Sequence, residues 1–135
     1  MEQYRDKLAY KAGKKSSEYD ESAKGHEADA YDVRKRGEDS AAYKELQSKR
    51  YADRASKYLE STGKDYAVSL DRVLDDVFDR TTLRSDLKDL YDSHSSQAKA
   101  DRSYAKSWMS TKSTLMNTPV SALTTKSDLK RIYKS

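Results

Sequence analysis

The sequence predicts an all-α protein, either an elongated helical hairpin or a small bundle of about three to five helices with a long polar N-terminal helical region. Residues that break helices are scarce, since the 135 residues include only 4 glycines and 1 proline. Apolar side chains recur at three- and four-residue spacing over several long stretches, which is the period of one helical face. Both features favour long helices over a flexible chain.

The apolar content is too low for a large core. Leu, Val, Ile and Phe make up about 13% of the chain, below the roughly 20% at which a self-sufficient core becomes doubtful. Disordered chains share this composition, but they carry a high net charge, whereas 27 basic and 23 acidic residues here leave only +4. We therefore expect long helices with thin apolar seams, completed by self-association or a protein partner.

Two regions differ in composition. Residues 1–64 form a polar, Tyr/Ala-rich region, and residues 65–135 form a more apolar region that ends in a basic segment. Residues 65–101 carry 5 basic and 9 acidic side chains, whereas residues 102–135 carry 7 basic and 1 acidic side chain. Segments of opposite charge can fold back on each other or pair head to tail between copies, and either arrangement steers association.

A 12-residue repeat spans residues 13–48. Each block begins with glycine and carries tyrosine six residues later: Gly13 with Tyr19, Gly25 with Tyr31, and Gly37 with Tyr43. In a straight helix, positions 12 residues apart point about 120° from one another, so these tyrosines do not form one stripe. Either the helix is continuous and contacted on several sides, or each glycine permits a bend; a repeat without any role is the third interpretation. A second register with four- and three-residue spacing favours a continuous helix across Gly25: Tyr19, Ala23, His26, Ala30 and Val33.

The next helix is predicted over residues 39–60, which contain good helix formers and no breaker. Its seam combines aromatic, small and apolar side chains: Tyr51, Ala55, Tyr58 and Leu59. Alanine allows close approach of another helix, and tyrosine adds contact area with a polar tip. Gly63 is expected to end this helix.

A third helix is predicted over residues 65–80, because apolar side chains at helical spacing follow a potential cap at Asp65. Asp71, Asp75 and Asp79 form an acidic ridge opposite that apolar face. Like charges four residues apart cost about 0.2–0.5 kcal/mol per pair in an isolated helix. The ridge is a candidate docking surface for a basic partner, although a merely solvated face gives the same pattern.

A fourth helix is predicted from about Ser85 to Met116, with a seam of Leu87, Leu90, Tyr91, His94, Ala98, Ala105, Trp108 and Leu115. Asp101 and Lys112 interrupt this seam. Pro119 ends the helix because proline lacks a backbone donor and disfavours helix at the preceding residue. A short closing helix is predicted from Ser127 to about Lys134.

The residues that carry enzyme chemistry are nearly absent. The chain has no cysteine and only two histidines, His26 and His94, without a second histidine at helical spacing or a nucleophile motif. The four glycines lie too far apart for one phosphate-binding loop. We therefore expect no enzymatic activity, cofactor, metal or small-molecule substrate. We also expect no membrane span and no signal peptide, and hence synthesis in a cytosol. Incorporation into a particle or large complex is a separate expectation, which follows from the need for a partner.

The sequence thus predicts a structural or interaction protein that acts as a subunit of a larger assembly, with the general composition of small helical subunits of phage particles. Candidate partner-binding residues are Tyr19, Tyr31, Tyr43, Tyr51, Tyr58, Tyr104 and Trp108. One alternative is a nucleic-acid-binding accessory protein that uses the basic C-terminal third: Arg102, Lys106, Lys112, Lys126, Lys130, Arg131 and Lys134. A small helical inhibitor of another protein is the other alternative.

Overall fold

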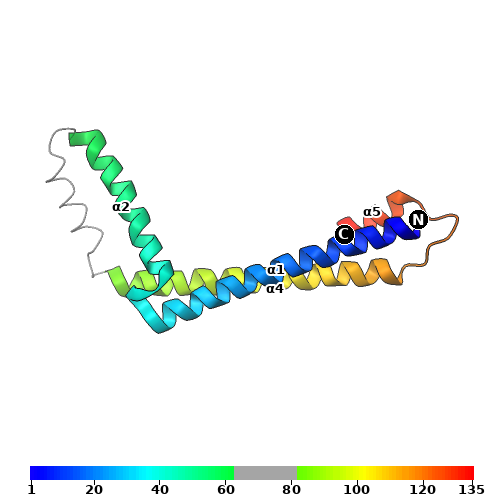
Figure 1. Ribbon diagram of the computed structural model, residues 1–135, viewed down its shortest axis with the longest axis horizontal. Coiled ribbons are helices and arrows are strands. Elements are labelled where there is room, and N and C mark those ends of the chain that lie inside the picture. The colour runs from blue at the N-terminus through cyan, green and yellow to red at the C-terminus, as the bar shows by residue number, and fades with distance from the viewer. Residues whose placement is uncertain (63–81) are drawn as a thin grey trace. The chain divides into compact units, whose positions relative to one another are not determined.

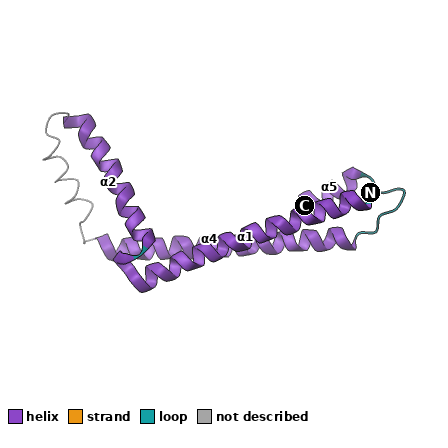
Figure 2. Cartoon of the chain, viewed as in Figure 1, coloured by secondary structure: helices purple, strands orange, loops and turns teal. Residues whose placement is uncertain are grey.

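The computed structural model describes the backbone of residues 1–62 and 82–135, and the side chains of residues 1–57 and 82–135. Four α-helices and one short 3-10 helix form the described part of the chain (Figures 1 and 2): α1 (Glu2–Arg36), η1 (Gly37–Asp39), α2 (Ala41–Thr62), α4 (Leu83–Asn117) and α5 (Lys126–Lys134). The described residues contain no strand, and the predicted all-α fold is confirmed. The predicted helix at 65–80, with its acidic ridge Asp71, Asp75 and Asp79, lies outside the described residues.

The chain divides into two compact units, which we describe separately. Unit 1 comprises Met1–His26 and Ser96–Ser135, and unit 2 comprises Glu27–Ser95. Each unit therefore combines residues from the polar and the more apolar region of the sequence. Unit 1 carries 14 basic and 7 acidic residues, whereas unit 2 carries 13 basic and 16 acidic residues.

Helix α1 is continuous through two of the three repeated glycines and ends at the third. Gly13 and Gly25 lie inside the helix, as the second register of the sequence predicted for Gly25. Gly37 adopts a φ of 54°, a left-handed conformation that favours glycine because it has no Cβ atom. The three basic residues before it, Arg34 to Arg36, lie where they interact favourably with the negative end of the helix dipole.

In unit 1, α1 and α4 run antiparallel. Arg5 donates a hydrogen bond to the backbone oxygen of Thr118 (3.1 Å), and the buried Ser16 hydroxyl donates to the backbone oxygen of Ala105 (2.8 Å). A small core of Leu8, Ala9, Leu115 and Leu129 joins these helices to α5, with Tyr4, Ile132 and Tyr133 packed against it. The elements that carry both chain ends are thereby held in one unit.

The connection between α4 and α5 confirms the predicted breaker. Helix α4 ends at Asn117, two residues before Pro119, and α5 begins at Lys126. The Thr125 hydroxyl accepts a hydrogen bond from the backbone N–H of Asp128, and the Asp128 carboxylate accepts one from the backbone N–H of Thr125. This reciprocal capping box satisfies two backbone donors at the start of α5, and the backbone hydrogen bond from Thr125 lowers the pKa of Asp128.

In unit 2, the end of α1 is tied to the start of α2. The buried Ser40 hydroxyl accepts a hydrogen bond from the backbone N–H of Tyr43 (3.3 Å), in the position of an N-cap. The Asp32 carboxylate accepts a hydrogen bond from the backbone N–H of Ala41 (2.9 Å). Helix α2 therefore begins close to the residue 39 that the sequence predicted, with η1 as the turn that separates it from α1.

The core of the described residues is thin, as the composition predicted. Six of the eleven buried apolar side chains among these residues are alanines: Ala9, Ala12, Ala23, Ala30, Ala98 and Ala105. Alanine permits close helix packing but removes little apolar area from water, so each helix pair gains little from burial. In the part of the chain that the structure describes, no helix combines the length and apolarity needed to cross a membrane.

Candidate functional site

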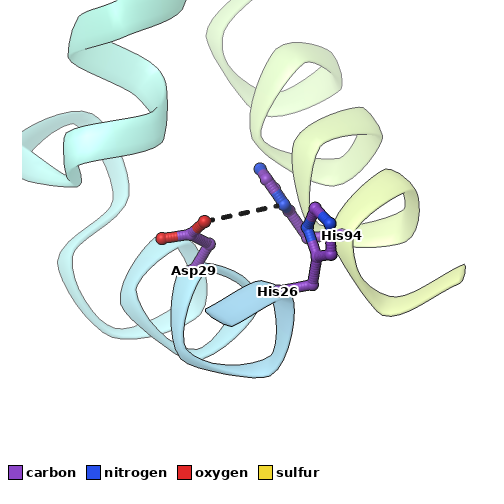
Figure 3. A group of neighbouring side chains, drawn as sticks. All are labelled: His26, Asp29 and His94. Carbon is purple, nitrogen blue, oxygen red and sulfur yellow. Dashed lines mark ion pairs between the residues drawn. The ribbon is translucent and has the colours of Figure 1, made fainter. Parts of the chain in front are cut away.

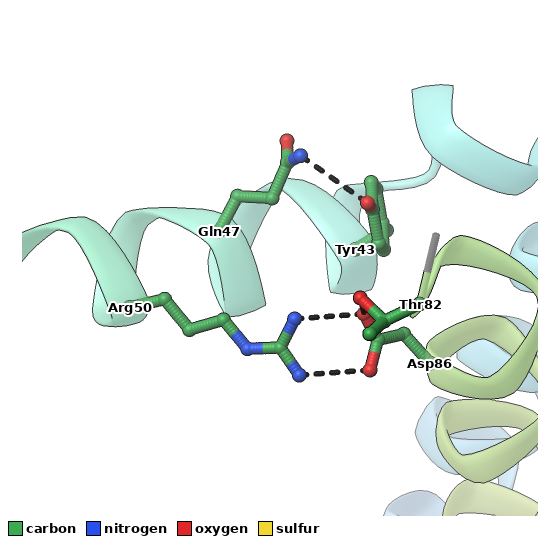
Figure 4. Close-up of polar contacts among 5 residues, drawn as sticks. All are labelled: Tyr43, Gln47, Arg50, Thr82 and Asp86. Atoms are coloured by element: carbon green, nitrogen blue, oxygen red, sulfur yellow. Dashed lines mark hydrogen bonds and ion pairs between the residues drawn. The ribbon is translucent and has the colours of Figure 1, made fainter. Parts of the chain in front are cut away.

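A part-buried ion pair in unit 2 joins α2 to the start of α4 (Figure 4). The two terminal nitrogens of Arg50 donate to the two carboxylate oxygens of Asp86, at 2.7 and 2.8 Å. The Thr82 hydroxyl donates a third hydrogen bond to Asp86, at 3.0 Å. Asp86 is only 8% exposed, whereas the Arg50 side chain is 35% exposed, so the carboxylate side of this two-pronged contact is shielded from water and the guanidinium side only in part.

The electrostatics of this pair follow from its geometry. The hydrogen bonds from Arg50 lower the pKa of Asp86, with a smaller contribution from Thr82, and burial opposes the shift. The same hydrogen bond raises the pKa of Arg50. Both groups are therefore held in their charged forms, as expected for a structural contact.

Tyr43, one of the expected partner-binding residues, is buried in unit 2. It is 4% exposed, and its hydroxyl accepts a hydrogen bond from Gln47 at 3.2 Å (Figure 4). Its ring packs inside the fold because the turn after Gly37 starts α2 in a new phase. Tyr43 therefore contributes to the fold, and its side chain presents almost no surface to a partner.

Other tyrosines of the expected set are exposed. Tyr31 of unit 2 and Tyr104 of unit 1 are 63% and 55% exposed, and the Tyr104 ring stacks on Tyr19 with the ring centres 5.2 Å apart. Tyr10, which the sequence did not single out, is 72% exposed. Tyr51 is half-buried on α2, and the side chain of Tyr58 lies outside the described residues.

Trp108 belongs to an aromatic cluster of unit 1. Its ring centre lies 5.1 Å from that of Tyr133 on α5, and the ammonium group of Lys15 lies 4.4 Å from the Trp108 ring centre. A cation over an aromatic face is attracted by the ring quadrupole. The half-buried Trp108 thus connects α1, α4 and α5 within the unit.

The seven basic residues of the C-terminal third fall into two groups. Four have intramolecular contacts: Arg102 pairs with Asp20 at 3.1 Å, Lys112 lies against Gly13, Lys126 lies over the ring of Tyr4, and Arg131 pairs with Asp128 at 3.7 Å. Lys106, Lys130 and Lys134 are exposed and make no ion pair with the described residues. Of the seven, these three are the ones that could bind an external anion without losing a contact described above.

Each histidine faces a carboxylate of the neighbouring helix in its own unit. In unit 2, Nδ1 of His94 lies 3.8 Å from a carboxylate oxygen of Asp29 (Figure 3). In unit 1, Nε2 of His26 lies 4.0 Å from a carboxylate oxygen of Asp101. That oxygen is buried and has no hydrogen-bond partner among the described residues. Asp101, which interrupts the predicted seam, therefore lies opposite His26.

A pocket of about 350 Å³ lies between α1 and α4 in unit 2. It is lined by Val33, Arg34, Gly37, Leu87, Lys88 and Tyr91. Val33 is buried, Leu87 and Tyr91 are half-buried, and the two basic residues are exposed, one on each helix. The pocket therefore has apolar walls between two cations.

The sequence did not predict this pocket or the Arg50–Asp86 pair. Val33, Leu87 and Tyr91 were recognised as seam residues, which indicates burial but not an opening beside them. No sequence pattern joined Arg50 to Asp86, which are 36 residues apart. The chain matches no protein-family model, no curated protein and no solved structure at a significant level.

Proposed function

We propose that this chain is a non-enzymatic subunit of a larger assembly, formed with copies of itself or with another protein. The observation that carries the proposal is the combination of a thin, alanine-rich core with large exposed side chains. Tyr10, Tyr31 and Tyr104 are each more than half exposed, whereas six of the eleven buried apolar residues in the described part of the chain are alanines. Tyrosine supplies contact area at a low entropy cost and is enriched at protein interfaces.

The distribution of charge supports the same function. Unit 1 has an excess of 7 basic residues and unit 2 an excess of 3 acidic residues. Opposite charges on different parts of one chain steer copies toward a fixed relative orientation. Seams of the coiled-coil type, in which three- and four-residue spacing alternates, would give such a subunit helical faces to share with a neighbour. A virion-type particle is one assembly in which such a subunit would serve.

The test is to identify what copurifies with the tagged full-length chain, for the wild type and for a variant in which Tyr31 and Tyr104 are both replaced by Ser. Both side chains are exposed, so the helical circular dichroism of the variant should match the wild type. We expect a protein or further copies of the chain with the wild type, and a marked loss with the variant. Equal recovery with both forms would argue against docking through tyrosines, and the absence of any bound protein would argue against the assembly.

Nucleic-acid binding is the second candidate function, because Lys106, Lys130 and Lys134 are exposed without ion pairs among the described residues. The adjacent surface of α4 is less favourable. The hydroxyl groups of Thr111 and Thr114 already donate to backbone oxygens of their own helix. What they present to an incoming phosphate is an acceptor oxygen, whereas a phosphate needs donors. Binding to DNA and RNA at several salt concentrations tests this function, which fails if affinity at low salt is negligible.

A further inference from the structure

The pocket between α1 and α4 of unit 2 has the size and chemistry of a small binding site. Its volume of about 350 Å³ lies at the lower end of the range for ligand pockets. Val33, Leu87 and Tyr91 provide its apolar surface. Gly37 contributes no side chain, and its left-handed backbone keeps larger residues from this position. The missing side chain at Gly37 therefore leaves this part of the pocket open.

The two charged residues that line the pocket are both basic. Arg34 on α1 and Lys88 on α4 line it, are exposed, and make no ion pair with the described residues. The carboxylate of Asp32 does not neutralise them, because one of its oxygens lies 3.8 Å from Arg36 and the other accepts a hydrogen bond from Ala41. A group that enters the pocket thus meets two cations from two different helices.

An exposed aromatic residue extends this surface along α1. Tyr31 lies three residues before Arg34, which places the two side chains on neighbouring turns of one face. Its ring is 63% exposed, and the ammonium group of Lys35 lies 5.8 Å from the ring centre. At protein interfaces a few anchor residues carry most of the binding energy, and tyrosine and arginine are enriched among them.

We propose that this pocket binds an apolar side chain presented by an acidic amphipathic helix of a partner protein. The apolar side chain fills the space between Val33, Leu87 and Tyr91, and Asp or Glu residues on its flanks pair with Arg34 and Lys88. Two neighbouring helices form a groove in which a third helix can lie, and an amphipathic helix places apolar anchors three and four residues apart. This inference rests on the proposed function, because it names the kind of protein partner with which the chain would assemble.

Binding of synthetic helical peptides to the full-length chain tests this inference. The probe is a fluorescein-labelled peptide with Leu at three- and four-residue spacing on one face and Glu on the flanks. One matched peptide carries Lys in place of Glu, and another carries Ser in place of Leu. We expect the acidic apolar peptide to bind, its affinity to fall with added salt, and both matched peptides to bind at least about tenfold more weakly.

The variant Arg34→Glu/Lys88→Glu should weaken binding of the acidic peptide by about tenfold or more. The variant Lys11→Glu/Lys14→Glu is the matched control, because it changes the net charge equally at exposed positions of α1 in unit 1. Circular dichroism establishes that both variants keep the helical content of the wild type. An equal loss of binding in both variants would overturn the inference, as would equal binding of the acidic and the basic peptide or no binding of the acidic one.

Two further outcomes separate this inference from the proposed function. If a partner protein copurifies with Arg34→Glu/Lys88→Glu as with the wild type, the assembly remains and this pocket is not its docking site. If a labelled oligonucleotide competes with the acidic peptide for the pocket, the pocket binds nucleic acid and the inference is overturned.

Discussion

Gly13 on α1 lies against the side chain of Lys112 on α4, so that a Cβ atom at Gly13 would be only 3.2 Å from Cδ of Lys112. Lys112 occupies a position of α4 in register with Ala105, Trp108 and Leu115, where a lysine interrupts the apolar pattern. The missing side chain of Gly13 leaves room for the end of the lysine side chain, since Nζ of Lys112 would also lie only 3.3 Å from that Cβ atom. The glycine thus compensates for the polar residue opposite it.

The first prediction compares the two glycines inside α1. No atom lies within 4 Å of a Cβ built at Gly25, so Gly25→Ala should raise the free energy of unfolding by about 0.5–1 kcal/mol through helix propensity alone. Gly13→Ala should raise it by less, because Lys112 must move. Urea denaturation of both variants measures the difference. An equal gain for both would show that the contact with Lys112 has no energetic consequence.

Gly37 should respond in the opposite direction. Its φ of 54° is a left-handed conformation that costs an ordinary residue about 1–2 kcal/mol, so Gly37→Ala should destabilise the chain by about this amount. Gly37→Asn should cost less, because asparagine tolerates this conformation better. Urea denaturation of the two variants gives the comparison, and stabilisation by Gly37→Ala would contradict the assigned turn.

The Arg50–Asp86 pair should contribute to the stability of unit 2. Asp86→Ala removes two hydrogen bonds to a charged partner and leaves Arg50 unpaired, so we expect a loss of about 1.5–3 kcal/mol in the free energy of unfolding. Asp89→Ala is the control, since it makes the same charge change at an exposed position of α4 and should stay within about 0.5 kcal/mol of the wild type. Similar losses for both variants would assign the effect to net charge.

The same pair predicts how stability depends on pH. The pKa of Asp86 is lower in the folded chain than in the unfolded chain, so the folded state binds the proton less readily. Its contribution is fully present above the unfolded pKa of about 4 and is lost as the pH falls through the lower folded value.

The advantage of the wild type over Asp86→Asn should therefore be constant between neutral pH and about pH 5, and should shrink below about pH 4. Urea denaturation of both proteins over a pH series measures it. An advantage that stays unchanged into strong acid would mean that the charge of Asp86 does not contribute.

The sequence predicted those features that depend on local patterns. Periodicity and the break before Pro119 placed a helix over 85–116 and another over 127–134, close to the observed Leu83–Asn117 and Lys126–Lys134. The sequence left open whether the repeated glycines bend the helix, because the residue type alone does not show what surrounds each glycine in the fold. Here Gly13 accommodates a neighbour, Gly25 faces open space and Gly37 ends the helix.

The features that the sequence did not predict depend on contacts between distant residues. The 12-residue period grouped Tyr43 with Tyr19 and Tyr31, yet Tyr43 is buried because the turn at Gly37 changes the direction of the chain before it. A signal for this turn was present, since basic residues and a glycine precede a serine cap at Ser40. For Arg50 and Asp86, by contrast, the spacing alone carries no information about their pairing.

The proposed role as an assembly subunit is tested most directly by sedimentation velocity combined with circular dichroism over a range of concentrations of the full-length chain. We expect the isolated chain either to associate as concentration rises, with a parallel gain in helicity, or to remain incompletely helical until a copurifying partner is added. A stable and fully helical monomer at every concentration would contradict the role, because such a chain needs no partner to complete its core.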